Sequence, residues 1–132
     1  MKRTPLNRKG KQKISVFKRK AWEVFSKFIR NRDDYRCFTC GKEGEGSGMH
    51  AGHYINKALS QNLLFNEINV NAQCYRCNIH LGGNIDEYGH RLKIKYGEGI
   101  IEELRELKEI DKQWTIQELE ELINKYRELI HS

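Results

Sequence analysis

The sequence predicts a mostly helical α+β fold, with a small core closed by cysteines between a basic N-terminal helix and a C-terminal helical hairpin. Its four cysteines form two Cys-x-x-Cys pairs, Cys37/Cys40 and Cys74/Cys77. Apolar residues recur three and four positions apart both before the first pair and after the second, as in amphipathic helices. Only short runs between the two pairs suit strands.

The bulk composition fits one domain that is not inserted in a bilayer. The chain has 132 residues, of which 38% are hydrophobic. No apolar run approaches the length of a membrane span, and the N-terminus has no apolar core of the signal-peptide kind. Together with the paired cysteine spacing, these features predict a reducing, cytoplasmic setting.

Positive charge is concentrated at one end of the chain. The net charge is +6, but residues 1–32 carry 12 Lys and Arg against one acidic residue, Glu23. Residues 100–132 carry 5 basic residues against 9 acidic ones. This asymmetry favours a polyanionic partner that is reached by the N-terminal end.

Residues 1–12 are expected to form a flexible basic arm, and residues 13–31 an amphipathic helix. The helix has an apolar stripe that is most simply core. Its opposite face carries four basic residues, Arg19, Lys20, Lys27 and Arg30. We expect this face to contact DNA phosphates, and the alternative is a plain solvated surface.

The two Cys-x-x-Cys pairs predict a tetrahedral site for structural zinc. Each such turn directs two thiolates at one point, and two turns complete a Cys₄ shell. Two disulfides or four unrelated buried thiols are the alternatives, and both would make the paired spacing a coincidence. A saturated shell leaves no open position for substrate, so any chemistry must come from other residues.

Between the cysteine pairs, the sequence suggests loops and two short strands. Residues 41–52 contain five glycines and are expected to form a mobile loop. Residues 53–55 and 70–73 are predicted to be the strands, joined by a long loop over residues 56–68.

The C-terminal part is predicted to be helical. A short helix covers residues 74–81, and a second one opens at Asn84, where Asn84 and Glu87 resemble a capping box, and ends at Gly97. Residues 99–132 are expected to form an acidic helical hairpin, its last helix opening on a second capping box of Thr115 and Glu118. The apolar side of this hairpin either packs on the core or forms a dimer interface.

The motifs of the central region resemble a known family. They read FIRNRD, CFTCGK, AGHYI, LFNEINVNAQCYRCN, LGGNIDEY and KYG, and run from residue 21 to about residue 104. The chain is similar here to HNH (ββα-metal) nucleases, and in particular to the phage recombination endonucleases of the NinG (Rap) family. The resemblance implies a ββα-metal core within residues 13–98.

The resemblance also implies roles for individual residues. His53 would be the general base, Asn69 would brace the strand pair, and Asn78 would bind a catalytic Mg²⁺ or Mn²⁺. The common motif has a metal-binding residue directly before the base, where this chain has Gly52. His50 is the first candidate for the ligand that is then unassigned, and His80 and Asn84 are the alternatives.

The resemblance therefore implies a metal-dependent endonuclease acting on DNA, with branched recombination intermediates such as Holliday junctions or displacement loops as substrates. Two similar cuts across a junction would be made most simply by a homodimer. The alternative is a zinc-stabilised DNA-binding module without catalysis, in which Gly52 marks a metal site that has been lost.

Overall fold

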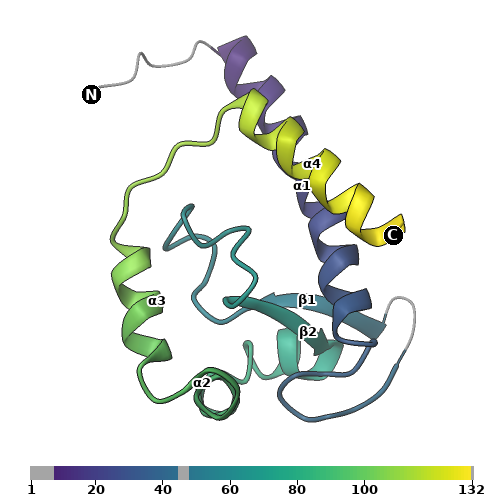
Figure 1. Cartoon of the computed structure of the whole chain (residues 1–132), viewed down its shortest axis with the longest axis vertical. Coiled ribbons are helices and arrows are strands. Elements are labelled where there is room, and N and C mark those ends of the chain that lie inside the picture. Colours follow the sequence, from purple (N-terminus) through teal and green to yellow (C-terminus); the bar gives the residue numbers. More distant parts are fainter. Residues whose placement is uncertain (1–7, 45–47, 132) are drawn as a thin grey trace.

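A computed structural model describes residues 8–44 and 48–131 of the chain. Its elements are α1 (Arg8–Arg32), β1 (Met49–His53), β2 (Val70–Cys74), the π-helical turn η2 (Arg76–His80), α2 (Ile85–Tyr96), α3 (Ile100–Lys108) and α4 (Ile116–His131). The fold is α+β and mostly helical, as predicted, with a single two-stranded sheet among the described residues (Figure 1). Within these residues, no helix combines the length and apolar character needed to cross a membrane.

The long helix α1 and the last helix α4 pack side by side and form the main core (Figure 1). The predicted apolar stripe of α1 is buried, with Ala21, Phe25 and Ile29 almost fully covered. Phe25 and Tyr126 of α4 meet edge to face with ring centroids 4.9 Å apart. Ring burial of this kind supplies much of the free energy that holds two helices together.

Helix α1 starts earlier than predicted. It begins at Arg8, so residues 8–12 belong to the helix and not to a flexible arm. Lys, Arg and Gln have good helix propensity, and they extend the helix beyond its apolar stripe. Residues 1–7 of the predicted arm lie outside the described residues.

The predicted C-terminal hairpin does not form. Helix α3 packs against α2 and α4 packs against α1, and an extended segment over residues 109–115 connects the two (Figure 1). Leu119, Ile123 and Tyr126 of α4 are buried in the core that α4 forms with α1, whereas Leu129 is exposed. Packing on the core was one of the two alternatives for this apolar side, and α4 shows it, while a dimer interface stays a prediction.

The two capping boxes have different outcomes. At α4, Thr115 N–H donates to Glu118 Oε1 at 3.0 Å and Glu118 N–H donates to Thr115 Oγ1 at 3.1 Å, which confirms this box. At α2, Asn84 makes no side-chain capping bond. Its amide donates instead to Cys77 Sγ at 3.7 Å, so the cysteine cluster uses this side chain and the predicted box is wrong.

The antiparallel sheet is longer than predicted at its first strand. Strand β1 covers Met49–His53, so it ends at His53, where the sequence suggested that it begins. Its register pairs His50 with Gln73 and Gly52 with Asn71. Residues 41–52 were predicted to be a loop because of their glycines. The last residues of this range form a strand because they pair with β2, which is fully buried.

An ion pair connects α1 to the sheet. Arg32 lies against Asp33 in a two-pronged contact, with Nε to Oδ1 at 2.7 Å and Nη2 to Oδ2 at 3.0 Å. Arg32 also donates to the backbone oxygens of Glu67 and Val70, and Asp33 Oδ2 accepts from Ala72 N–H at 2.8 Å. The end of α1 is thereby fixed to β2, which sets the position of the helix over the sheet.

Candidate functional site

The four cysteines come together as predicted, and they can hold one zinc ion. Their Sγ atoms all lie within 4.8 Å of one another. Cys40 Sγ and Cys74 Sγ are 3.7 Å apart, which is too far for a disulfide. With Zn–S bonds of about 2.3 Å, the sulfurs of a tetrahedral site are separated by about 3.8 Å. The spacing therefore fits a zinc site.

Hydrogen bonds prepare one of these thiols to ionise. Burial raises the pKa of the Cys37 thiol, but hydrogen bonds from the Thr39 hydroxyl and from nearby backbone N–H groups outweigh it and lower this pKa to about 6. Burial raises the pKa of Cys40 to about 12. A zinc ion that bound this set would release protons from it.

A pocket of ≈ 730 Å³ lies between α1, the end of β1 and η2. Three of the residues singled out in the sequence, His50, His53 and Asn78, line it together. Arg30 of α1 and Lys57 of the loop between the strands also line it. The pocket therefore combines imidazole, amide and cationic groups within reach of a ligand.

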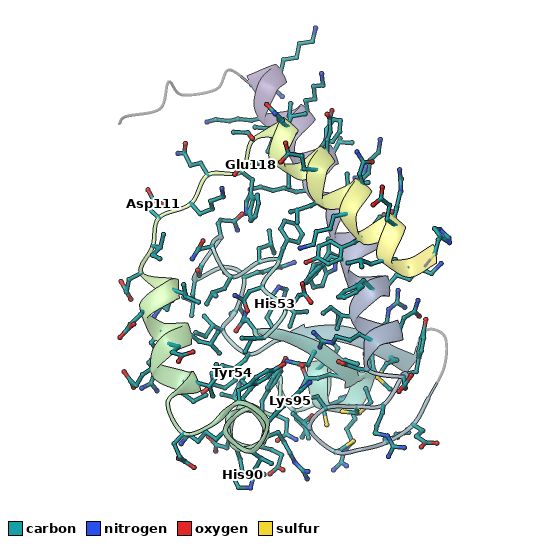
Figure 2. All side chains as sticks on the ribbon, in the orientation of Figure 1. His53, Tyr54, His90, Lys95, Asp111 and Glu118 are labelled. Carbon is teal, nitrogen blue, oxygen red and sulfur yellow. The ribbon has the colours of Figure 1, made fainter. Side chains whose placement is uncertain are left out.

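His53 is held in one orientation at the end of β1. Its Nε2 lies 3.0 Å from the backbone oxygen of Leu64, which can only accept a hydrogen bond. Nε2 therefore carries the proton in the neutral ring, and Nδ1 keeps a free lone pair. The ring stacks on Trp22 of α1 at a centroid distance of 4.8 Å. Figure 2 shows His53 inside the molecule and His90 on the outer side of α2.

Burial lowers the pKa of His53 below its ordinary value of 6.5. The nearby positive charge of Lys57 acts in the same direction, and the hydrogen bond to Leu64 only partly opposes both. The imidazole is therefore neutral at pH 7, which is the form that a general base needs.

Asn78 and His50 contact each other within the pocket. Asn78 Nδ2 lies 3.1 Å from His50 Nδ1, and with the amide nitrogen as donor the ring nitrogen accepts. This bond leaves Asn78 Oδ1 free on the other side of the amide. Amide oxygens are suitable ligands for hard divalent cations such as Mg²⁺ and Mn²⁺.

Gly52 has no room for a side chain. A methyl group on its Cα would lie 2.0 Å from Gln73 Oε1 and 2.9 Å from Asn78 Oδ1. Both distances are shorter than a van der Waals contact. The space next to His53, where the resembling family carries an acidic or imidazole group, is thus filled by the side chain of Gln73 from the opposite strand.

Asn69 is fully buried and braces the loop between the strands. Its Oδ1 accepts from Ile55 N–H at 2.8 Å, and its Nδ2 donates to the backbone oxygens of Ile55 and Leu63 at 3.0 and 3.4 Å. These bonds fix the chain on both sides of His53 and Leu64. The bracing of the strand pair by Asn69 that the resemblance implies stays a prediction, and what these bonds join is the start of the long loop at Ile55 and its middle at Leu63.

The two alternative ligands lie elsewhere. His80 is exposed and packs edge-on against Tyr75 with ring centroids 5.0 Å apart, and Asn84 is bonded to Cys77. Neither is among the residues that line the pocket with Asn78.

The four basic residues of α1 are not equivalent. Arg30 lines the main pocket, whereas Lys27 lines a smaller one with Arg127 and His131 of α4. Arg19 and Lys20 are exposed. The predicted basic face is therefore divided, and only its Arg30 end borders the His53 site.

Sequence reasoning missed three side chains at or beside this pocket. Trp22 lies within the predicted N-terminal helix, Lys57 within the predicted long loop and Gln73 within a predicted strand, and none of the three was singled out. A signal existed for Gln73, because a strand that is buried on both faces has little reason to carry a polar residue unless that residue has a partner.

Comparisons with known proteins were made for the whole chain. Residues 2–132 match the family model described as "Bacteriophage Lambda NinG protein". The chain is 33% identical over 115 residues to Protein ninG of Escherichia phage lambda, covering 86% of this chain and 55% of that protein. It is 32% identical to Protein ninG of Escherichia phage 933W and 31% identical to that of Salmonella phage P22, each over 86% of this chain and 56% of the relative.

The chain thus spans about half the length of the curated relatives it matches. No solved structure gives a significant match. The family match covers nearly the whole chain, including both cysteine pairs and every residue of the pocket described above. By this match, the chain belongs to the NinG family of phage proteins.

Proposed function

We propose that this protein is a metal-dependent DNA endonuclease that hydrolyses phosphodiester bonds in the pocket formed by His53, Asn78 and Arg30. One observation carries the proposal. The bond from His53 Nε2 to Leu64 O leaves Nδ1 as the unprotonated ring nitrogen, and His53 lines the same pocket as Asn78. The order of two antiparallel strands and a short helix supports the HNH-like reading of this region.

In the proposed reaction, His53 Nδ1 takes a proton from a water molecule, whose oxygen attacks the phosphorus atom. The bond from phosphorus to the 3′ oxygen breaks, the 3′ oxygen takes a proton from solvent water, and His53 returns its proton to solvent, so the products carry a 5′-phosphate and a 3′-hydroxyl. The hydrogen bond from Nε2 to Leu64 keeps the imidazole aimed during this transfer. General-base catalysis of this kind contributes about 10²–10⁴ to a rate.

The remaining residues would bind and orient the DNA. Arg30 and Lys57 border the pocket and would contact the phosphates beside the one that is cut. Asn78 Oδ1 would hold a Mg²⁺ or Mn²⁺ ion, and His50, the tentative ligand of the sequence analysis, contacts the nitrogen of the same amide. When bound, such an ion supplies positive charge against the negative charge that develops at the phosphate. The free amide oxygen of Asn78 suits this ion.

The cysteine cluster would hold a structural zinc ion and support this site through η2. Cys77 directly precedes Asn78, and both lie in η2. Zinc binding would therefore fix the turn that presents the Asn78 amide. Branched DNA is proposed as the substrate because the resemblance to phage recombination endonucleases implies it. A homodimer is proposed because two similar cuts across a junction are made most simply by two sites related by a two-fold axis.

The basic face of α1 should provide affinity that does not depend on DNA sequence. Replacing Arg19, Lys20, Lys27 and Arg30 by Gln should weaken binding and flatten its salt dependence, because each lost phosphate contact lowers the log-log slope by about 0.9. Fluorescence anisotropy of labelled duplex DNA across a salt series measures this slope. Replacing Lys125 and Arg127 of α4 by Gln is the control, and equal slopes in both variants would contradict the assignment.

A panel of DNA structures tests the proposed function. Zinc-loaded protein is incubated with single-stranded, duplex, forked and four-way DNA, with and without Mg²⁺. We expect Mg²⁺-dependent cleavage that is fastest on the branched forms. Binding without cleavage on every form would favour the zinc-stabilised DNA-binding module.

A further inference from the structure

We propose that Gln73 supplies the second protein oxygen of the cation site, and that His50 positions Asn78 without binding the cation. This inference rests on the proposed function, because it concerns the ion that Asn78 is proposed to hold. Gly52 has no side chain that could bind the cation, and the inference gives this role to Gln73 on the opposite strand.

The first observation is an unpaired oxygen. Among the buried side-chain nitrogen and oxygen atoms of residues 8–44 and 48–131, Gln73 Oε1 alone has no hydrogen-bond partner. The other half of the same amide is well satisfied, since Nε2 donates to Gly83 O at 2.8 Å and to Thr39 Oγ1 at 3.2 Å. The Gly83 oxygen can only accept, so the amide cannot be turned around. An acceptor that is buried and unpaired is unfavourable unless something binds it.

The second observation is the direction of this oxygen. Gln73 Oε1 and Asn78 Oδ1 lie 2.0 and 2.9 Å from the point that a Cβ on Gly52 would occupy. The two amide oxygens therefore lie close to each other beside Gly52, and neither brings a hydrogen to share. A divalent cation between them would satisfy both, because amide oxygens are common ligands of such ions.

The strand register explains why Gln73 can take this place. His50 and Gln73 are direct partners across the sheet, and Gly52 is two residues from His50, on the same face. The missing side chain at Gly52 leaves the space that Gln73 enters. A side chain added at Gly52 would displace both oxygens.

The contact of His50 points to a different role for that residue. Its Nδ1 accepts the hydrogen bond from Asn78 Nδ2, so the neutral ring carries its proton on Nε2. While this bond is kept, neither ring nitrogen offers a lone pair to a cation. With this bond in place, Asn78 Oδ1 lies near Gly52, as Gln73 Oε1 does. His50 is therefore a positioning residue for the Asn78 amide.

The inference can be tested on the unaltered protein by carbon NMR. Zinc-loaded, ¹³C-labelled protein is titrated with Mg²⁺, and the side-chain carbonyl carbons of Gln73 and Asn78 are followed. We expect both to shift with one common midpoint, while those of Gln61 and Gln117 stay fixed. A shift at Asn78 alone would overturn the role of Gln73 and leave the proposed function standing. No shift at either residue would overturn both.

Two substitutions provide an independent measurement. Free Mn²⁺ is quantified by electron paramagnetic resonance in the presence of each zinc-loaded variant. Gln73→Leu should weaken Mn²⁺ binding at least tenfold, because it removes the amide oxygen from the site. The matched control, Gln117→Leu on the exposed side of α4, should bind as the wild type does. Wild-type Mn²⁺ affinity in a folded, zinc-loaded Gln73→Leu variant would contradict the inference.

Discussion

Replacing Cys74 by Ser should reduce bound zinc well below one equivalent and lower the melting temperature by roughly 10 °C or more, since a loss of about 3 kcal/mol has this effect on a chain of this size. The physical reason is that zinc binding and folding are linked. Cys74 Sγ also accepts a hydrogen bond from Cys77 N–H at 3.5 Å, so this sulfur helps to fix the turn into η2. Metal analysis and thermal unfolding measure both effects.

Zinc removal from the wild-type protein is the matched comparison. A selective zinc chelator should lower the melting temperature of the wild type to a similar extent, and added zinc should restore it. Added zinc should not restore Cys74→Ser. If the metal-free wild type were as stable as the zinc-loaded form, the cysteine cluster would not be a structural zinc site.

Replacing His53 by Ala should reduce DNA cleavage about a hundredfold or more, because it removes the group that takes a proton from water. DNA affinity and zinc content should remain close to those of the wild type. His53→Gln keeps a donor that can reach towards Leu64 O but provides no base, so it should be equally slow. Single-turnover cleavage measures the rate, and His90→Ala, which alters an exposed histidine on α2, is the control.

The pH dependence of the reaction gives a second readout of His53. Its pKa is below 6.5, so the reactive neutral form persists as the pH falls to that value, and the acidic limb of the rate profile should have its midpoint below 6.5. Trp22→Leu should expose the ring to water, raise this pKa and move the midpoint to higher pH. If the midpoint of the acidic limb were the same in Trp22→Leu as in the wild type, His53 would not be the group that takes the proton in the rate-limiting step.

The sequence predicted those parts of the fold that depend on local pattern. The apolar periodicity of α1 and α4, the box of Thr115 and Glu118 and the clustering of the four cysteines are all present in the structure. The pairing of helices was not predictable in the same way. An amphipathic pattern shows that a helix has an apolar face, but it does not identify the helix that covers this face, and α4 therefore packs on α1 and not on α3.

The candidate site was predictable in part for a similar reason. Motif resemblance singled out His53, His50 and Asn78, which the fold brings to one pocket. The unpaired oxygen of Gln73 could not be seen, since it depends on the side chain crossing from β2 to the empty position at Gly52. The extension of β1 back to Met49 was hidden as well, because cross-strand pairing overrides the local preference of glycine for loops.

The central claim is that the pocket of His53 and Asn78 hydrolyses DNA when a divalent cation is present. The most direct test is the nicking of supercoiled plasmid by zinc-loaded wild-type protein, with and without Mg²⁺, beside the His53→Ala variant. We expect nicked circles with 3′-hydroxyl ends only for the wild type with Mg²⁺. Full activity of His53→Ala, or nicking by the wild type that does not depend on Mg²⁺, would contradict it.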